Sequence, residues 1–216
     1  MKQYAIIGLG RFGTSLALTL QELGQEVLGI DANEEIVNNL SGKLTHIIQA
    51  DAADENVLKS LGIRNFDVVV VSMGLDLESS ILITLHCKEM GVPKVIVKAT
   101  DDLHSRILYK IGADSVILPE QEMGIRVARN LISGSVLEYI ELSSEYTLVE
   151  IKALPAWQNK TLRDLNIRTK YGVNIMAIKR NDGDMNIAPT ASDKIGADDI
   201  LVVIGHKDNI NKLEKL

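Results

Sequence analysis

Short runs rich in Ile and Val alternate with helix-like stretches between Gln3 and Ile132, and this alternation severely limits the fold. Each run is followed by a connection long enough for a crossover helix, which is typical of repeated βαβ units. Aromatic residues are only 4% of the chain, so Ile, Val and Leu must fill the core, as in a buried parallel sheet. The expected strands are Tyr4–Leu9, Val27–Asp31, His46–Ala50, Val68–Ser72, Val95–Lys98 and Ser115–Leu118.

Six strands with five intervening helices predict an α/β fold, a Rossmann-like doubly wound parallel sheet of strand order 3-2-1-4-5-6. In such a sheet the order reverses between the first and fourth strands. Ligands bind in the crevice at the carboxyl ends of those two strands. The sequence therefore predicts where a nucleotide site would lie.

The rhythm changes at Ser133-Gly134-Ser135, which predicts a helix stop and a hinge. We expect a nucleotide-binding domain over residues 1–134 and a small α+β domain over residues 135–216. The second domain is near the lower size limit for independent folding, so pairing with a second copy would help it. Its expected elements are strands at Val136–Leu142, Leu148–Ala153, Val173–Lys179 and Ile200–Gly205, a turn at Asn181–Asp184, and short helices at Leu162–Leu165 and from Asp208.

Charge and composition exclude several classes of protein. Lys and Arg total 23 against 29 Asp and Glu, with no basic cluster, so nucleic acid is not an expected partner. No export signal and no apolar run of about 20 residues is evident, which predicts a soluble protein that reaches a membrane only through a partner. A single cysteine, Cys87, allows no internal disulfide and fits a reducing cytoplasm.

A glycine motif, Gly8-Leu9-Gly10-Arg11-Phe12-Gly13, joins the first expected strand to the first helix. In this setting G-x-G-x-x-G indicates dinucleotide or nucleotide binding. Gly8 would allow a tight turn, Gly10 would let a pyrophosphate approach the backbone, and Gly13 would let helix and strand pack closely. Such a turn can also occur without a ligand.

Two charged residues extend this prediction. Asp31 lies eighteen positions after Gly13, near the spacing at which a carboxylate accepts hydrogen bonds from ribose hydroxyls and repels a 2′-phosphate. It would equally serve as a cap or turn residue before the next helix. Arg11 could reach a terminal phosphate, in its own site or across a dimer, or could form an ordinary surface ion pair.

The carboxyl ends of three further strands complete the expected crevice. Asp51 and Ala52 follow the third strand and could contact adenosine. Met73 and Gly74 follow the fourth strand and could line an adenine pocket, although a core methionine and a loop glycine would look the same. Lys98 ends the fifth strand and could add positive charge near phosphates, or be a surface lysine.

No catalytic constellation stands out. The four histidines are scattered without metal-ligand spacing, and no Ser/His/Asp or Cys/His arrangement is evident. An NAD-dependent oxidoreductase would use the same first domain but would need an acid or base that the second domain does not obviously offer. A stand-alone redox or nucleotide sensor remains another alternative, because a fold does not fix a function.

Four segments together resemble the Trk/Ktr potassium uptake regulatory subunits, which combine the N-terminal and C-terminal lobes of an RCK domain. They are IIGLGRFG at the start, NFDVVVVSMG, KIGADSVILPEQEMG from Lys110, and KYGVNIMAIKR from Lys170. The resemblance implies a non-enzymatic subunit, assembled from dimers into an octameric ring, that docks on the inner face of a membrane potassium channel or transporter. ATP and ADP are the ligands of Ktr-like members, and NAD(H) is bound by many Trk-like ones.

The resemblance also assigns roles to individual residues. Arg11 and Phe12 fall in the phosphate-binding turn, with Arg11 on the family's phosphate-reaching arginine. Glu120 matches an acidic residue that coordinates a divalent cation, Mg²⁺ or Ca²⁺, or Na⁺. The acidic loop Leu75–Ser79 departs from the Ktr-like pattern, which puts its nucleotide contacts in doubt. Cyclic di-AMP is implied in the C-terminal lobe, at residues that would serve equally as core: Ile167, Arg168, Asn174, Ile175, Ala188 and Pro189.

Overall fold

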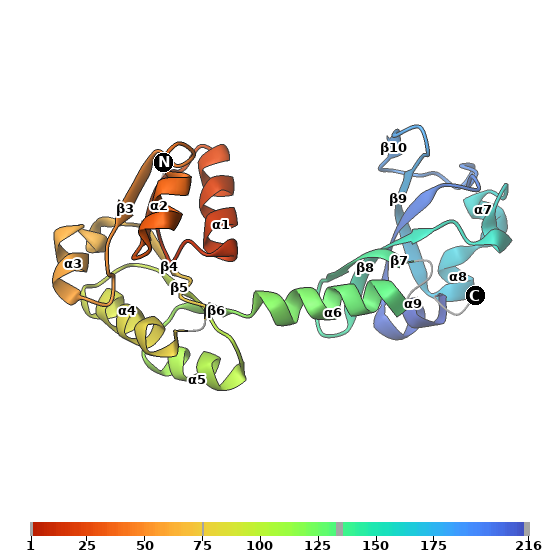
Figure 1. The fold of residues 1–216 in the computed structure, drawn as a ribbon. Coiled ribbons are helices and arrows are strands. Elements are labelled where there is room, and N and C mark those ends of the chain that lie inside the picture. The colour runs from red at the N-terminus through yellow and green to blue at the C-terminus, as the bar shows by residue number, and fades with distance from the viewer. Residues whose placement is uncertain (1, 75, 133–135, 214–216) are drawn as a thin grey trace. The chain divides into compact units, whose positions relative to one another are not determined.

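A computed structural model describes residues 2–74, 76–132 and 136–213 of the chain. The chain divides into two compact units, Met1–Gln121 and Glu122–Leu216. One helix, α6 (Pro119–Ile132), carries the chain from the first unit into the second (Figure 1). The domain boundary expected between residues 134 and 135 falls outside the described residues.

The first unit is built on a six-stranded parallel sheet of order β3-β2-β1-β4-β5-β6, which confirms the predicted topology. Its strands are β1 (Gln3–Ile7), β2 (Glu26–Asp31), β3 (His46–Gln49), β4 (Val68–Val71), β5 (Val95–Lys98) and β6 (Ser115–Ile117). The helices between them are α1 (Arg11–Glu22), α2 (Glu34–Leu40), α3 (Glu55–Ser60), η1 (Ile63–Asn65), α4 (Leu77–Glu89) and α5 (Asp102–Lys110).

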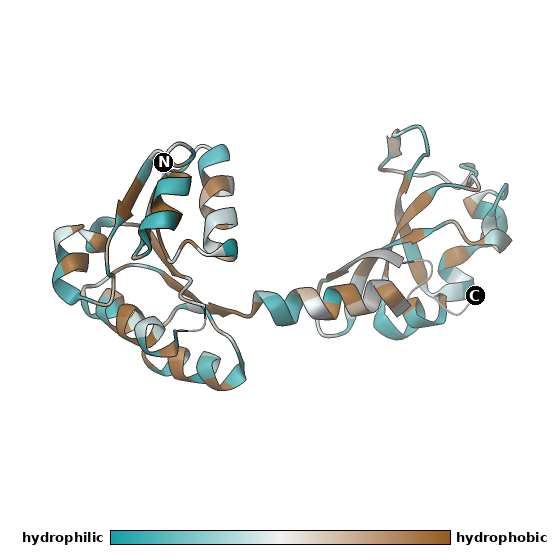
Figure 2. Ribbon diagram, viewed as in Figure 1, coloured by the Kyte–Doolittle hydropathy of each residue, from teal (hydrophilic) through white to brown (hydrophobic). Residues whose placement is uncertain are grey.

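Helices cover both faces of this sheet, as two separate apolar clusters show. On one face α1 and α2 pack Ala17 and Leu40 against Ile6 and Val70. The other face is covered by α3, α4 and α5, and Figure 2 shows the apolar strands between the two layers. Since every central strand is buried on both sides, continuous apolar runs such as that of β4 replace alternation.

Side-chain caps explain where four of the helices begin. The N-cap residues Asn33, Asp54, Asp76 and Asp101 each accept a hydrogen bond from a backbone N–H in the first turn of α2, α3, α4 and α5. Asp54 is thus the N-cap residue of α3. The acidic loop after Gly74 contributes one of these caps, because Asp76 accepts from the backbone and hydroxyl of Ser79.

The second unit is a five-stranded antiparallel sheet of order β10-β9-β11-β8-β7. Its core includes Trp157, which is 1% exposed, with Val149, Ile178 and Leu201. The elements are β7 (Val136–Glu141), β8 (Tyr146–Lys152), η2 (Pro155–Trp157), α7 (Leu162–Leu165), α8 (Ile167–Tyr171), β9 (Val173–Lys179), β10 (Met185–Asn186), β11 (Ile200–His206) and α9 (Lys207–Leu213).

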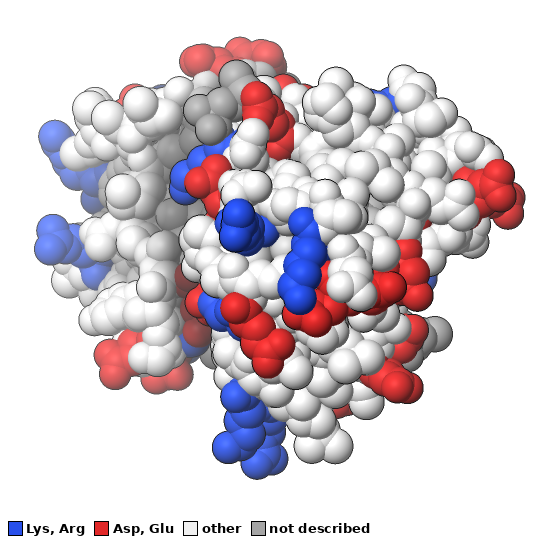
Figure 3. Space-filling view, turned by 90° about the vertical axis from the view of Figure 1, so that its left-hand side faces the viewer, with Lys and Arg blue, Asp and Glu red and all other residues white. Residues whose placement is uncertain are grey.

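The outer surface shows mixed charge. On the face drawn in Figure 3, acidic and basic side chains are interspersed rather than gathered by sign. In the described part of the chain, none of the helices has the length and apolar character that crossing a bilayer requires.

Candidate functional site

The glycine motif forms the turn between β1 and α1, and two of its glycines are required by close packing. Gly8 has a φ of +88°, and a Cβ there would lie 2.6 Å from the carbonyl oxygen of Ser72 at the end of β4. A Cβ on Gly13 would lie 1.9 Å from the carbonyl oxygen of Gly8. The turn is therefore pressed against both β4 and the first turn of α1, as G-x-G-x-x-G turns require.

Gly10, in contrast, faces open space. It is the N-cap residue of α1, and among the described residues no atom beyond its two chain neighbours lies within 4 Å of where its Cβ would be. Unlike α2 to α5, this helix has no side-chain cap, so its first N–H groups are left to other acceptors. A bare helix amino terminus beside an open glycine fits the phosphates of a nucleotide.

Asp31, at the end of β2, braces the same turn. Its Oδ2 accepts a hydrogen bond from the backbone N–H of Leu9 at 2.6 Å, and its Oδ1 accepts from the N–H of Asn33 at 2.8 Å. Asn33, not Asp31, caps α2. Each carboxylate oxygen keeps a second lone pair, so Asp31 can still accept from ribose hydroxyls. The link between Asp31 and Leu9 was not foreseen from the sequence.

Residues after β3 and β4 form the other expected parts of the crevice rim. Met73 lies against the turn, with its sulfur 3.2 Å from where a Cβ on Gly8 would be. Gly74 has a φ of +57° and no neighbour near its Cβ position. Asp51 is exposed and accepts from the N–H of Ala53, while Ala52 is buried. Within the described residues, neither Asp51 nor Ala52 forms a hydrogen bond to the glycine turn.

Lys98 connects the first turn of α1 to the first turn of α6. The side chain leaves the carboxyl end of β5 and is only 12% exposed. Its Nζ lies 6.0 Å from the ring centroid of Phe12, in the first turn of α1, and 2.5 Å from Oε1 of Glu120, in the first turn of α6. Donation from Lys98 lowers the pKa of Glu120, and the nearby charge of Arg11 acts in the same direction. The structure thus gathers Arg11, Phe12, Lys98 and Glu120.

Glu120 is not part of a preformed metal centre formed by the residues that the structure describes. No group of three or more His, Cys, Asp or Glu side chains suited to a metal occurs in residues 2–74, 76–132 and 136–213. A single carboxylate can hold a cation only together with oxygen ligands from elsewhere, such as phosphates or a second copy. Its role as a cation ligand stays a prediction.

The second unit has a hollow of about 290 Å³ beside α7, α8 and β9. Four of the six residues predicted to bind cyclic di-AMP line it, whereas Ala188 and Pro189 do not. Arg163 also lines it and was not predicted. Ile167 is 5% exposed and belongs to the core of this unit, so it packs as well as lines the hollow. The eight lining residues are Leu162, Arg163, Asn166, Ile167, Arg168, Val173, Asn174 and Ile175.

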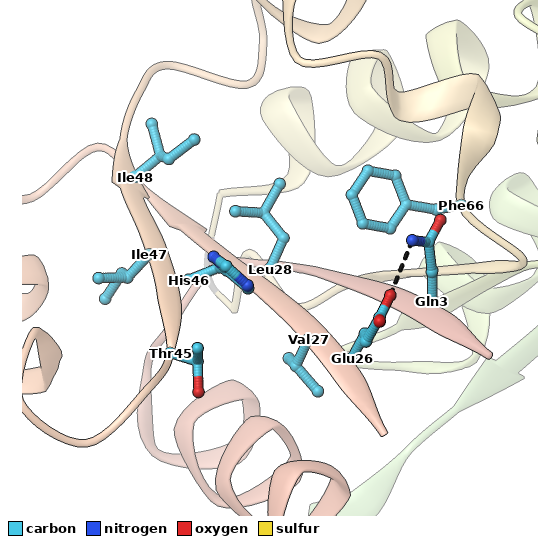
Figure 4. Close-up of a pocket in the computed structure, with 9 residues that line it drawn as sticks. All are labelled: Gln3, Glu26, Val27, Leu28, Thr45, His46, Ile47, Ile48 and Phe66. Carbon is cyan, nitrogen blue, oxygen red and sulfur yellow. Dashed lines mark hydrogen bonds between the residues drawn. The ribbon is translucent and has the colours of Figure 1, made fainter. Parts of the chain in front are cut away.

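Another hollow, of about 360 Å³, lies at the amino ends of β1, β2 and β3, opposite to the glycine turn (Figure 4). Its one carboxylate, Glu26, already accepts a hydrogen bond from Gln3 at 2.8 Å. None of the predicted site residues lines it. The lining residues are Gln3, Glu26, Val27, Leu28, Thr45, His46, Ile47, Ile48 and Phe66.

Many protein families share this fold, and comparison with known proteins shows which of them the chain belongs to. Residues 4–119 match the TrkA-N domain model and residues 146–216 the TrkA-C domain model. Ktr system potassium uptake protein C of Bacillus subtilis (strain 168) is 47% identical over 214 residues, which cover 99% of this chain and 96% of that protein. The chain belongs to the Trk/Ktr family of potassium uptake proteins.

Two solved structures share the fold of this chain. The GsuK RCK domain aligns with 99% of this chain at a TM-score of 0.54 and 23% identity, which shows the shared fold. This chain covers 46% of the length of that GsuK chain. A GsuK structure bound to ADP aligns with 60% of this chain and 33% of its own length, at a TM-score of 0.51 and 26% identity.

Proposed function

We propose that this Trk/Ktr family member is a cytoplasmic regulatory subunit that gates a membrane potassium channel or transporter by binding adenine nucleotide, and that it is not an enzyme. The observation that carries the proposal is the open, uncapped amino terminus of α1 at Gly10, in a chain 47% identical to a Ktr potassium uptake protein. Its position would be peripheral, on the inner face of the membrane, through the partner.

The ligand proposed for the first unit is ATP or ADP. Asp31 at the ribose end disfavours a 2′-phosphate, and Arg11 and Lys98 supply two cations at the phosphate end. The ADP-bound GsuK structure supports a diphosphate nucleotide in a related first unit. NAD(H) is the alternative, and with it a redox sensor or an NAD-dependent oxidoreductase.

Regulation requires that ATP and ADP favour different arrangements of the protein, because a ligand shifts an equilibrium only through differential affinity. The γ-phosphate provides that difference, and Arg11 is the residue proposed to read it. Dimers of the chain, assembled into an octameric ring, would pass the difference to the membrane subunit.

For the second unit, cyclic di-AMP is the proposed ligand. Its hollow combines the exposed cation of Arg168 with the amide of Asn174 and the apolar wall of Ile175, which suits a phosphate linked to a base. Ala188 and Pro189 are not among the eight residues that line this hollow. Any contact that they make with the ligand would therefore be made outside the hollow.

The first test is a thermal-shift series with ATP, ADP, NAD and NADH on the full chain. Binding adds RT ln(1 + [L]/Kd) to the free energy of unfolding and so raises the unfolding temperature. ATP and ADP should both stabilise the protein, and Arg11→Ala should reduce the ratio of their affinities at least threefold with the fold intact. Equal weakening of ATP and ADP would show that Arg11 does not read the γ-phosphate. Preferential stabilisation by NADH would favour the alternative.

The second test is calorimetry with cyclic di-AMP. Arg168→Ala should weaken its binding about tenfold or more, because a charge-assisted contact to phosphate is lost, while ATP binding persists. Lys152→Ala removes an exposed cation from the same unit outside the hollow and serves as the matched control. An unchanged affinity in the Arg168 variant would remove the proposed site.

A further inference from the structure

The pairing of Lys98 with Glu120 joins two functions that the sequence assigns separately. Lys98 was predicted to meet nucleotide phosphates, and Glu120 to meet a cation. The structure instead joins them to each other at 2.5 Å. An ammonium group has three N–H donors but only one positive charge, so other anions brought to it compete with Glu120 for that charge.

Lys98 is the less exposed member of its ion pair with Glu120. Its side chain is 12% exposed, whereas that of Glu120 is 70% exposed. A lysine this buried needs a partner for its charge, while the carboxylate remains well solvated without one. Breaking the pair therefore leaves Glu120 in water and requires only that Lys98 find another anion.

The other anion would come from the first turn of α1. The Nζ of Lys98 lies 6.0 Å from the ring of Phe12, the second residue of the helix whose amino terminus is open at Gly10. Because β4 is the only strand between β1 and β5, a four-carbon stem from the end of β5 reaches across the crevice. Polyphosphate bound there would carry more negative charge than one carboxylate.

Other interactions would still stabilise the charged Glu120 carboxylate after it loses Lys98. It is the second residue of α6, where the helix dipole favours a negative side chain. The charge of Arg11 also acts on it. Since α6 carries the chain out of the first unit, its first turn is where an exchange of ion pairs in the crevice would be transmitted onward.

We propose that Lys98 is shared between two competing anions, the phosphate groups of the bound nucleotide and Glu120, so that nucleotide binding releases Glu120 in the first turn of α6. This inference rests on the proposed nucleotide binding. It adds the residue pair through which nucleotide binding would change the contacts of α6.

The test is a double-mutant cycle for ATP binding, measured by calorimetry on the full chain in EDTA. Glu120→Gln should tighten ATP binding about threefold to fivefold, because Lys98 is no longer held by a carboxylate. In a Lys98→Met background the same substitution should change the affinity less than about 1.5-fold, since no shared cation remains. Glu122→Gln, which removes a negative charge two residues further along α6, is the matched control and should have little effect.

Three outcomes would overturn the inference. Equal tightening in both backgrounds would mean that Glu120 merely repels the phosphates. Weaker binding by Glu120→Gln would mean that the carboxylate assists the ligand. No change in Glu120→Gln would mean that the pair does not compete. If the unmodified chain binds none of ATP, ADP and NAD, the proposed function fails and this inference fails with it, a result distinct from the other three.

A second measurement covers the case in which Lys98→Met does not fold. Hydrogen–deuterium exchange of the first turn of α6 should change when ATP is added to the unmodified chain. It should change much less in Glu120→Gln, whose surface substitution leaves no ion pair to break. An equal ATP-dependent change in both proteins would refute the proposed replacement of the Lys98–Glu120 ion pair by a Lys98–phosphate contact.

Discussion

Alanine at Gly13 is expected to destabilise the first unit strongly, whereas alanine at Gly10 is not. A Cβ on Gly13 would lie 1.9 Å from the carbonyl oxygen of Gly8, although real Cβ contacts essentially never fall below 3.0 Å. Backbone on both sides must therefore separate by roughly 1 Å, which breaks the packing of α1 on β1. We expect a loss of about 3 kcal/mol, the upper end of overpacking effects. That is a large share of the roughly 5–15 kcal/mol that stabilises a domain.

Gly10→Ala is the matched control, because among the described residues only its chain neighbours lie within 4 Å of the new methyl group, and the φ of −63° suits alanine. Its effect on stability should stay below about 1 kcal/mol, the cost of replacing an N-cap glycine by alanine. The methyl group would nevertheless occupy the space through which phosphates approach, so ATP binding should weaken at least tenfold. We therefore expect Gly13 to be needed for folding and Gly10 for the proposed ligand.

Urea unfolding followed by two signals can locate the damage. Trp157 is the only tryptophan and lies in the second unit, so its fluorescence reports that unit, while far-UV circular dichroism reports both. Gly13→Ala should lower the dichroism midpoint and leave the fluorescence transition in place. Equal stability of the two alanine variants, or a shift confined to Trp157, would refute the reasoning.

Two further predictions concern buried polar groups. Arg180→Leu leaves the carboxylate of Asp199, which is 5% exposed, without its ion-pair partner and should cost about 3 kcal/mol in the second unit; an unchanged midpoint of Trp157 fluorescence in urea would contradict this. Burial raises the pKa of the Cys87 thiol to about 12. Its thiolate is therefore scarce even at about pH 9, and a disulfide reagent should label it slowly in native protein and rapidly in urea; fast native labelling would disprove it.

The sheet of the first unit could be predicted because its information is local. Each apolar run is bounded by turn residues and followed by a helix-length connection, and right-handed crossovers leave few topologies to consider. The second unit was harder in detail. Helix α8 has five residues and strand β10 has two, so neither is long enough to show a period in the sequence.

The contacts within the candidate site could not be predicted from local sequence patterns. Leu9 and Asp31 are 22 positions apart, as are Lys98 and Glu120, and both contacts arise only when strands align at one edge of the sheet. Sequence spacing indicated which residues end the strands. It could not show that the predicted phosphate lysine and the predicted cation ligand are partners.

The two hydrogen bonds that Asp31 accepts have a consequence for redesign of ligand preference. Exchanging such an acid for a small or basic residue is the obvious way to admit a 2′-phosphorylated nucleotide. Here the same exchange would also strip acceptors from the amides of Leu9 and Asn33, and so loosen the turn that any nucleotide needs. If the proposed site is right, Asp31 sets both the ligand preference and the shape of the turn. An engineered variant would then have to replace both acceptors before its new specificity could be seen.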